Sequence, residues 1–227
     1  MAKKRVQTGS KAIDLILNGG VPKGTVTLLE GPPGIGKRDI ACHFLQKGKE
    51  NKEKVALVYR GYGPNDVGAY SDDRTQCPKD VTLIECSGST DAPATMRCNI
   101  GELFTVTDTI KKYFKENKGG RIVVDIVSDI SMLHQPQQMY KFLEQVARET
   151  KASKTTTLMI VDEGMQEKSA LVGLEHVCDG VIQLRLWEEG LKVTPVVRIK
   201  KLTGEKFDRE YFIYEKLKQG IKMVKST

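Results

Sequence analysis

A glycine-rich segment between residues 31 and 37 carries the clearest chemical pattern in the chain. Its glycines allow turns that point successive backbone N–H groups to one place, and the ammonium of Lys37 can reach the β and γ phosphates of a nucleotide. A strand candidate, Thr25 to Glu30, precedes the segment, and a helix candidate, Asp39 to Lys49, follows it and adds a positive dipole. This is a Walker A pattern in its usual setting. The segment reads Gly31-Pro32-Pro33-Gly34-Ile35-Gly36-Lys37.

The next residue departs from that pattern. Loops of this kind carry a Ser or Thr whose hydroxyl ligates Mg²⁺, and this chain carries Arg38. Asp39 follows, but one step along a helix rotates a side chain by about 100°, so its carboxylate is a poor substitute. Two outcomes stay open: Arg38 supplies charge to the phosphates in place of Mg²⁺, or it fills the pocket and excludes nucleotide. Residues 31–39 are therefore the candidate site for ATP or ADP, without a predicted metal ligand set.

A second motif lies about 90 residues downstream, where an apolar strand candidate ends in a carboxylate. It reads Arg121-Ile122-Val123-Val124-Asp125. In a Walker B strand such an aspartate holds Mg²⁺ through water, so Asp125 is the candidate metal-side carboxylate. Asp162 or Glu163, at the end of a later strand candidate, is an alternative source of a general base.

Short apolar runs rich in β-branched residues alternate with helical patterns, which is typical of a parallel sheet with crossover helices. After Leu186 the pattern changes to two antiparallel strand candidates around a turn at Thr203-Gly204. The sequence thus predicts one α/β domain over residues 1–227, with a mostly parallel sheet flanked by helices and a C-terminal antiparallel hairpin. The strand candidates are 25–30, 54–59, 81–86, 121–126, 155–161, 180–186, 191–200 and 209–214, and the helical stretches are 39–49, 107–115 and 138–150.

With these motifs the chain resembles the KaiC branch of the RecA superfamily of P-loop ATPases, from about Val6 to Tyr214. Its opening is similar to that family's Thr-Gly, Leu-Asp-like and Gly-Gly-Ile-Pro-x-Gly segments. The resemblance implies a RecA-like P-loop fold, although a fold alone does not establish an activity. The matching segments are Thr8-Gly9-Ser10-Lys11-Ala12-Ile13-Asp14-Leu15, Gly19-Gly20-Val21-Pro22-Lys23-Gly24 and Leu174-Glu175-His176-Val177-Cys178-Asp179-Gly180-Val181-Ile182.

The resemblance fails where that family keeps its catalytic residues. KaiC-like proteins end the second strand in two Glu residues, one of which polarises the attacking water, and here those places fall on Gly61 and Tyr62. The family also sends a Lys-Leu-Arg-Gly-Thr-x-His segment to the γ phosphate of a neighbouring subunit. This chain keeps Lys201 as a candidate contact but has Thr203 and Phe207 in place of the Arg and the His. Since a positioned base contributes about 10²–10⁴ in rate and a trans-acting arginine about 10³–10⁵, hydrolysis is expected to be lost or strongly impaired, with no catalytic residue assigned.

The charge of the chain is unevenly distributed along the sequence. The 227 residues carry a net charge of +7, but residues 6–197 hold 24 basic and 25 acidic residues. We therefore predict basic, solvated tails at residues 1–5 and 216–227. No apolar run approaches the roughly 18 residues of a membrane span, so we expect a cytoplasmic protein that does not bind membranes.

Five cysteines at wide spacings, with no Cys-x-x-Cys pattern, favour reduced and mostly buried thiols over a metal site. They are Cys42, Cys77, Cys86, Cys98 and Cys178.

Three functions fit these observations. The leading hypothesis is a nucleotide-binding regulatory module, a pseudo-ATPase that acts through a protein partner or a RecA-like paralogue. A slow ATPase, active in a homo-oligomer or beside an intact paralogue, is the second. A DNA-binding recombinase paralogue is the third and is disfavoured, because the loops after Asp125 and Glu163 offer only Lys168 as a basic residue.

Overall fold

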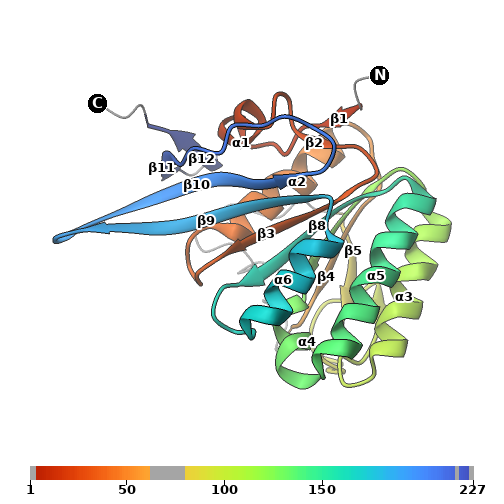
Figure 1. The fold of residues 1–227 in the computed structure, drawn as a ribbon. Helices are drawn as coiled ribbons and strands as arrows, with labels where there is room; N and C mark the ends of the chain where they lie inside the picture. Colours follow the sequence, from red (N-terminus) through yellow and green to blue (C-terminus); the bar gives the residue numbers. More distant parts are fainter. Residues whose placement is uncertain (1–3, 62–79, 218–219, 225–227) are drawn as a thin grey trace.

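Ten strands form one mixed sheet, and the computed structural model describes residues 4–61, 80–217 and 220–224 (Figure 1). In sheet order the strands are β12 (Gly220–Met223), β11 (Phe212–Leu217), β10 (Lys192–Leu202), β9 (Gly180–Glu189), β3 (Val26–Gly31), β8 (Thr156–Asp162), β7 (Arg121–Asp125), β4 (Val55–Tyr59), β5 (Thr82–Glu85) and β6 (Met96–Arg97). The strands from β9 to β6 in this order run parallel to one another, whereas β10, β11 and β12 continue the sheet antiparallel. A separate antiparallel pair joins β1 (Arg5–Val6) to β2 (Val21–Pro22).

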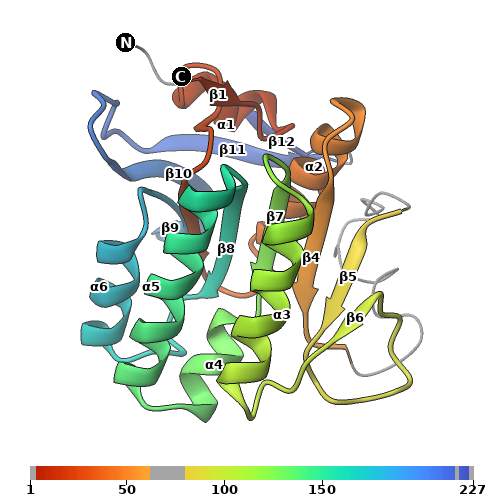
Figure 2. The same cartoon turned by 90° about the vertical axis from the view of Figure 1, so that its right-hand side faces the viewer.

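Helices cover both faces of the sheet (Figures 1 and 2). One face carries α1 (Lys11–Ile16) and α2 (Lys37–Glu50), and the other carries α3 (Leu103–Glu116), α4 (Val127–Leu133), α5 (Pro136–Ser153) and α6 (Lys168–Val177). No helix in the described ranges is both long enough and apolar enough to cross a membrane.

Alternate residues of the central strands enter two different cores. Leu29 and Val123 pack with the apolar side of α2, whereas Leu28 and Val124 pack with α3, α5 and α6. Because side chains alternate across a strand, both faces of these strands are buried, which explains their continuous apolar composition.

The predicted α/β architecture is confirmed, including the antiparallel C-terminal hairpin and its turn at residues 203–204. β9 and β10 are longer than expected and project beyond the helical layers (Figure 1). The helices predicted at 39–49, 107–115 and 138–150 are α2, α3 and α5, each slightly longer than expected.

Both predicted basic tails contain residues that the fold uses. Arg5 lies in β1, donates to the carbonyl oxygens of Leu17 and Gly20 at 2.6 and 2.7 Å, and forms an ion pair with Glu205. At the other end, β11 reaches residue 217 and β12 covers 220–223. The assignment of these residues to solvated tails was wrong, because the charge count along the sequence could not indicate the strand pairing that orders them.

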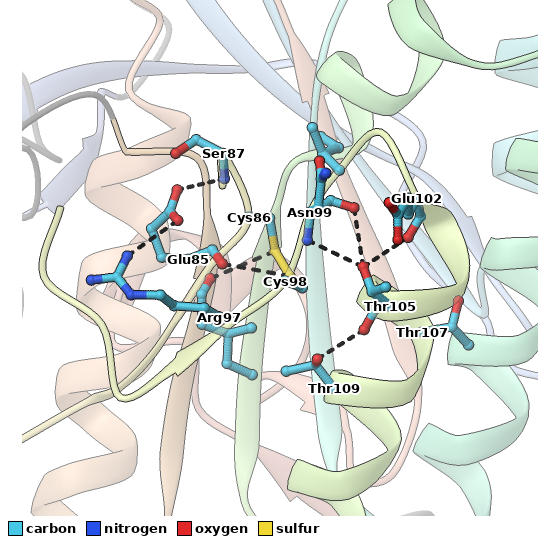
Figure 3. The surroundings of a disulfide bond; sticks show 12 residues. Glu85, Cys86, Ser87, Arg97, Cys98, Asn99, Glu102, Thr105, Thr107 and Thr109 are labelled. Atoms are coloured by element: carbon cyan, nitrogen blue, oxygen red, sulfur yellow. Dashed lines mark hydrogen bonds and ion pairs between the residues drawn. A yellow bond between two sulfur atoms is a disulfide. The ribbon is translucent and has the colours of Figure 1, made fainter. Parts of the chain in front are cut away.

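A disulfide joins Cys86 to Cys98, contrary to the expectation of reduced thiols (Figure 3). The parallel register between β5 and β6 pairs Glu85 with Arg97, so the next residues on each segment face one another with their Cα atoms 4.6 Å apart. The sequence did not predict β6, and without that strand the 12-residue spacing had no meaning. Cys178 is a buried thiol as expected, and its burial raises its pKa to about 12. Cys77 lies outside the described residues.

Candidate nucleotide-binding site

The glycine-rich segment joins the end of β3 to the start of α2, as the sequence predicts. Gly34 and Gly36 have φ angles of 76° and 104°, a left-handed backbone that a residue with a Cβ adopts only at a cost. Gly36 is the N-cap of α2, and no side chain caps the helix there. The first-turn N–H groups are therefore available to an anion, and the helix dipole favours one.

Lys37 is held inside this loop. Its Nζ lies 2.8 Å from the Gly31 carbonyl oxygen, 2.7 Å from the Pro32 carbonyl oxygen and 2.7 Å from Asp162 Oδ1. An ammonium has three N–H donors, so these three contacts engage all of them. A bound phosphate must exchange with at least one of these contacts. Asp162, weighed from the sequence as a replacement base, is instead the ion-pair partner of this lysine.

Arg38 reaches across the edge of the sheet to Asp125, at the end of β7. Its Nε lies 2.9 Å from Asp125 Oδ2. The Arg38 side chain is half exposed, whereas Asp125 is only 10% exposed. The residue that replaces the metal-ligating hydroxyl thus pairs directly with the carboxylate that would serve the metal.

These contacts test whether Mg²⁺ fits the site. The cation prefers near-octahedral ligation by oxygen atoms. Here the guanidinium of Arg38 stands where one oxygen ligand is expected, and it also pairs with the carboxylate of Asp125. Within the described ranges, no group of three or more His, Cys, Asp or Glu side chains could hold a metal ion. The loop fits phosphate, and the residues around it do not fit Mg²⁺.

Strand β11 supports the loop from behind, which the sequence did not indicate. The buried Tyr214 hydroxyl donates to the Ile35 carbonyl oxygen at 3.0 Å, and Lys216 Nζ lies 2.9 Å from Asp39 Oδ2. Asp39 is 1% exposed, so its buried carboxylate ties β11 to the start of α2. The signal available in the sequence was the alternation Phe212, Tyr214, Lys216, which predicts one strand face.

The two positions expected for the water-polarising glutamate are occupied by Gly61, which has no side chain, and by Tyr62, which lies outside the described residues. The backbone N–H of Gly61 instead donates to Glu85 Oε1 at 3.2 Å. Glu85 is fully buried, accepts a second N–H from Ser87, and faces Arg97 at 3.5 Å (Figure 3). Its carboxylate therefore organises the loops around β5.

Two further candidates lie away from the phosphate loop. Lys201 Nζ donates to the carbonyl oxygens of Glu175 and His176 at 2.8 and 3.0 Å, at the end of α6. This lysine lies near the start of β9, at the opposite edge of the sheet, so it does not reach the loop of its own subunit. A contact across a subunit boundary remains a prediction. Glu163 faces Arg185 at 3.5 Å.

The sheet order, with the phosphate loop after its central strand and a carboxylate at the end of β7, defines the class as a RecA-like P-loop fold. The model of the KaiC ATPase family matches residues 6–227, and the chain belongs to this family. The crystal structure of a KaiC-like protein from Pyrococcus horikoshii OT3 superposes with a TM-score of 0.76 at 21% identity, covering 99% of this chain and all of that one.

Relatives match this chain over most of their own length. A UPF0273 protein of Aeropyrum pernix is 27% identical over 96% of this chain and 92% of its own length. A UPF0273 protein of Thermotoga maritima is 24% identical over 96% of this chain and 95% of its own length.

Proposed function

We propose that this chain is a nucleotide-binding regulatory module of the KaiC family that takes ATP or ADP without Mg²⁺ and has lost efficient hydrolysis. The observation that carries the proposal is the 2.9 Å pair between Arg38 and Asp125. A guanidinium at this position provides a fixed positive charge and can donate two hydrogen bonds to phosphate. It takes over charge neutralisation that Mg²⁺ supplies in metal-dependent sites.

The surroundings of the loop support the loss of hydrolysis. Gly61 has no side chain to polarise water, and Glu85 is engaged by two backbone N–H groups and faces Arg97. Asp162 is committed to Lys37. A module that binds nucleotide and turns it over slowly acts by changing its contacts with another protein, and we expect that partner to be a RecA-like paralogue or a second copy of this chain.

Calorimetric titration with ATP, with Mg²⁺ and separately with EDTA, tests the proposal. The wild-type affinity should change less than threefold between the two conditions. Arg38→Thr removes the guanidinium that pairs with Asp125 and restores a hydroxyl, so its affinity should depend on Mg²⁺ by tenfold or more. Arg185→Thr removes another half-exposed arginine that also faces a carboxylate, and it should behave as wild type.

Three results would overturn this assignment. Wild-type binding that requires Mg²⁺ would mean that the site keeps its metal despite Arg38. No binding under any condition would mean that Arg38 plugs the pocket. ATP turnover of order 1 s⁻¹ would mean that the chain is an active ATPase with a rate in the ordinary enzyme range.

A further inference from the structure

The edge of the sheet opposite the phosphate loop carries a row of exposed lysines. β3, β8, β7 and β4 are neighbours in that order, and each is preceded by one exposed lysine. These residues, called here the lysine row, are Lys23, Lys154, Lys118 and Lys54. Figure 2 shows the segments that lead into β4, β7 and β8 side by side at the end of the sheet where α3 and α5 finish.

Backbone contacts join the four segments into one surface. A Cβ built on Gly24 would lie 3.5 Å from the Cα of Lys154. Gly119, next to Lys118, donates to the Ser153 carbonyl oxygen at 2.9 Å, and Arg121 donates to the Lys54 carbonyl oxygen at 2.9 Å. With strands about 4.8 Å apart, the row extends over about 14 Å.

Two more exposed lysines flank the row. Lys4 lies beside Lys23, whose N–H donates to the Lys4 carbonyl oxygen at 2.8 Å, and Lys52 precedes Lys54 by two residues. Together these residues provide six exposed ammonium groups on the loops at one edge of the sheet. Lysine side chains are long enough to reach a ligand that lies along this edge.

The positive charge of this edge exceeds that of its own carboxylates. The segments 22–25, 50–54, 116–120 and 151–155 contain six lysines and three acidic residues, Glu50, Glu53 and Glu116. Glu50 pairs with Lys47 on its own helix. Glu53 Oε2 lies 2.6 Å from Nε of the fully buried Arg121, and Asp179 is engaged by Lys151 and by the Val26 N–H. Within the described part of the chain, the lysines of the row and its flanks make no ion pair.

Helix ends hold two of these lysines in place. Lys154 is the C-cap of α5, and Lys52 directly follows the C-cap of α2, with φ angles of 57° and 59°. An ammonium at the C-terminus of a helix also complements the helix dipole. Both lysines are therefore presented at this edge by the ends of the helices that lead into it.

We propose that the lysine row is a docking surface for the sugar-phosphate backbone of a duplex nucleic acid. A duplex presents one phosphate per 3.4 Å of axis on each strand, so a 14 Å row faces about four of them. Tyr113 and Phe114, in the last turns of α3 beside this edge, are buried, so they offer no platform for stacking unpaired bases. Binding is therefore directed at phosphates and is independent of base sequence.

This surface is separate from the nucleotide site. A parallel strand of six residues spans about 20 Å, which is the separation between the row and the phosphate loop. It also differs from the loops after Asp125 and Glu163, where the sequence offered a single lysine. Failure of nucleotide binding would leave this proposal unaffected.

Fluorescence anisotropy with a labelled 20-base-pair duplex of random sequence, between 50 and 200 mM salt, tests the proposal. The row variant combines Lys23→Gln, Lys54→Gln, Lys118→Gln and Lys154→Gln. The control combines Lys141→Gln, Lys168→Gln, Lys192→Gln and Lys206→Gln, which removes the same charge from four other exposed lysines. Thermal melts confirm that both variants are folded.

We expect the row variant to bind at least tenfold more weakly at 50 mM salt, and its slope of log K against log[salt] to fall by about three to four, while the control stays within threefold of wild type. Equal losses in both variants would overturn the proposal. So would wild-type protein that fails to bind the duplex at 50 mM salt, or that binds vesicles with anionic lipids more tightly than the duplex. Matched DNA and RNA duplexes then distinguish the two sources of the backbone.

Discussion

The two ends of the parallel strands differ in how many of their basic side chains form ion pairs. Where the strands end, Lys37 pairs with Asp162, Arg38 with Asp125 and Arg60 with Asp129, at 2.7, 2.9 and 3.0 Å. Where they begin, the exposed lysines of the row make no ion pair among the described residues. The three cations of the first edge are thus held in ion pairs. At the second edge Arg121 and Lys151 are also paired, with Glu53 and Asp179, but the lysine row presents its charge to solvent. The net charge of the chain alone does not reveal this division.

The largest expected effect is at the edge where the strands end, and it concerns hydrolysis. Wild-type protein and Arg38→Thr should both release phosphate at background rates, because Gly61 cannot polarise water and Arg38→Thr does not supply a base. A missing base alone lowers the rate by about 10²–10⁴. A steady-state phosphate-release assay measures this, and turnover regained in Arg38→Thr alone would show that the metal site, not the base, limits the reaction.

The edge where the strands begin also contains a fully buried basic side chain, beneath the lysine row. Its loss should strongly destabilise the fold. Arg121 is fully buried and contacts Glu53, the Gln7 carbonyl oxygen and the Phe44 carbonyl oxygen. Arg121→Met leaves these acceptors without a donor and should lower the free energy of unfolding by about 3–5 kcal/mol.

Urea denaturation measures that loss. Arg148→Met, at an exposed position of α5, is the control and should change the free energy of unfolding by less than about 0.5 kcal/mol. Similar midpoints for the two variants would mean that the buried pair is not part of the stabilising core.

A smaller effect is expected where β11 meets the phosphate loop. Lys216→Met removes the ammonium that pairs with Asp39, a carboxylate that is 1% exposed, and should lower the free energy of unfolding by about 1–3 kcal/mol. Lys222→Met changes an exposed lysine of β12 and serves as the matched control in the same urea series. If both variants unfold at the wild-type midpoint, the hairpin does not support the loop.

The smallest effect should be a gain of affinity. Asp162→Asn removes a negative charge from the phosphate side and releases Lys37 from its ion pair, so ATP should bind about five- to tenfold more tightly. Glu163→Gln, on the next residue, should stay within twofold of wild type. Calorimetry of both variants in EDTA decides the matter, and unchanged or weaker binding by Asp162→Asn would mean that the ion pair helps to form the site.

The central part of the fold was predictable because its signals are local. The apolar strand before Gly31, the helix after it and the strand that ends at Asp125 are each visible in a short stretch of sequence. Strand β12, the short β6 and the role of Asp39 were not predictable. The two strands are short and carry little apolar pattern of their own. Asp39 pairs with Lys216, and the neighbouring contact between Tyr214 and Ile35 joins residues 179 apart in the sequence.

The sequence by itself determined the phosphate loop, the family and the absence of a glutamate at position 61, because these depend on residue types at fixed spacing. Only the tertiary structure decided which charges meet. Asp125 is 87 residues from Arg38, and pairing through the sheet brings the two side chains together. The lysines of the row are spread from position 23 to 154, and they become neighbours because parallel strands place all their starting ends at one edge. A count of charges along the chain averages over that arrangement, whereas the electrostatic field at the surface depends on it.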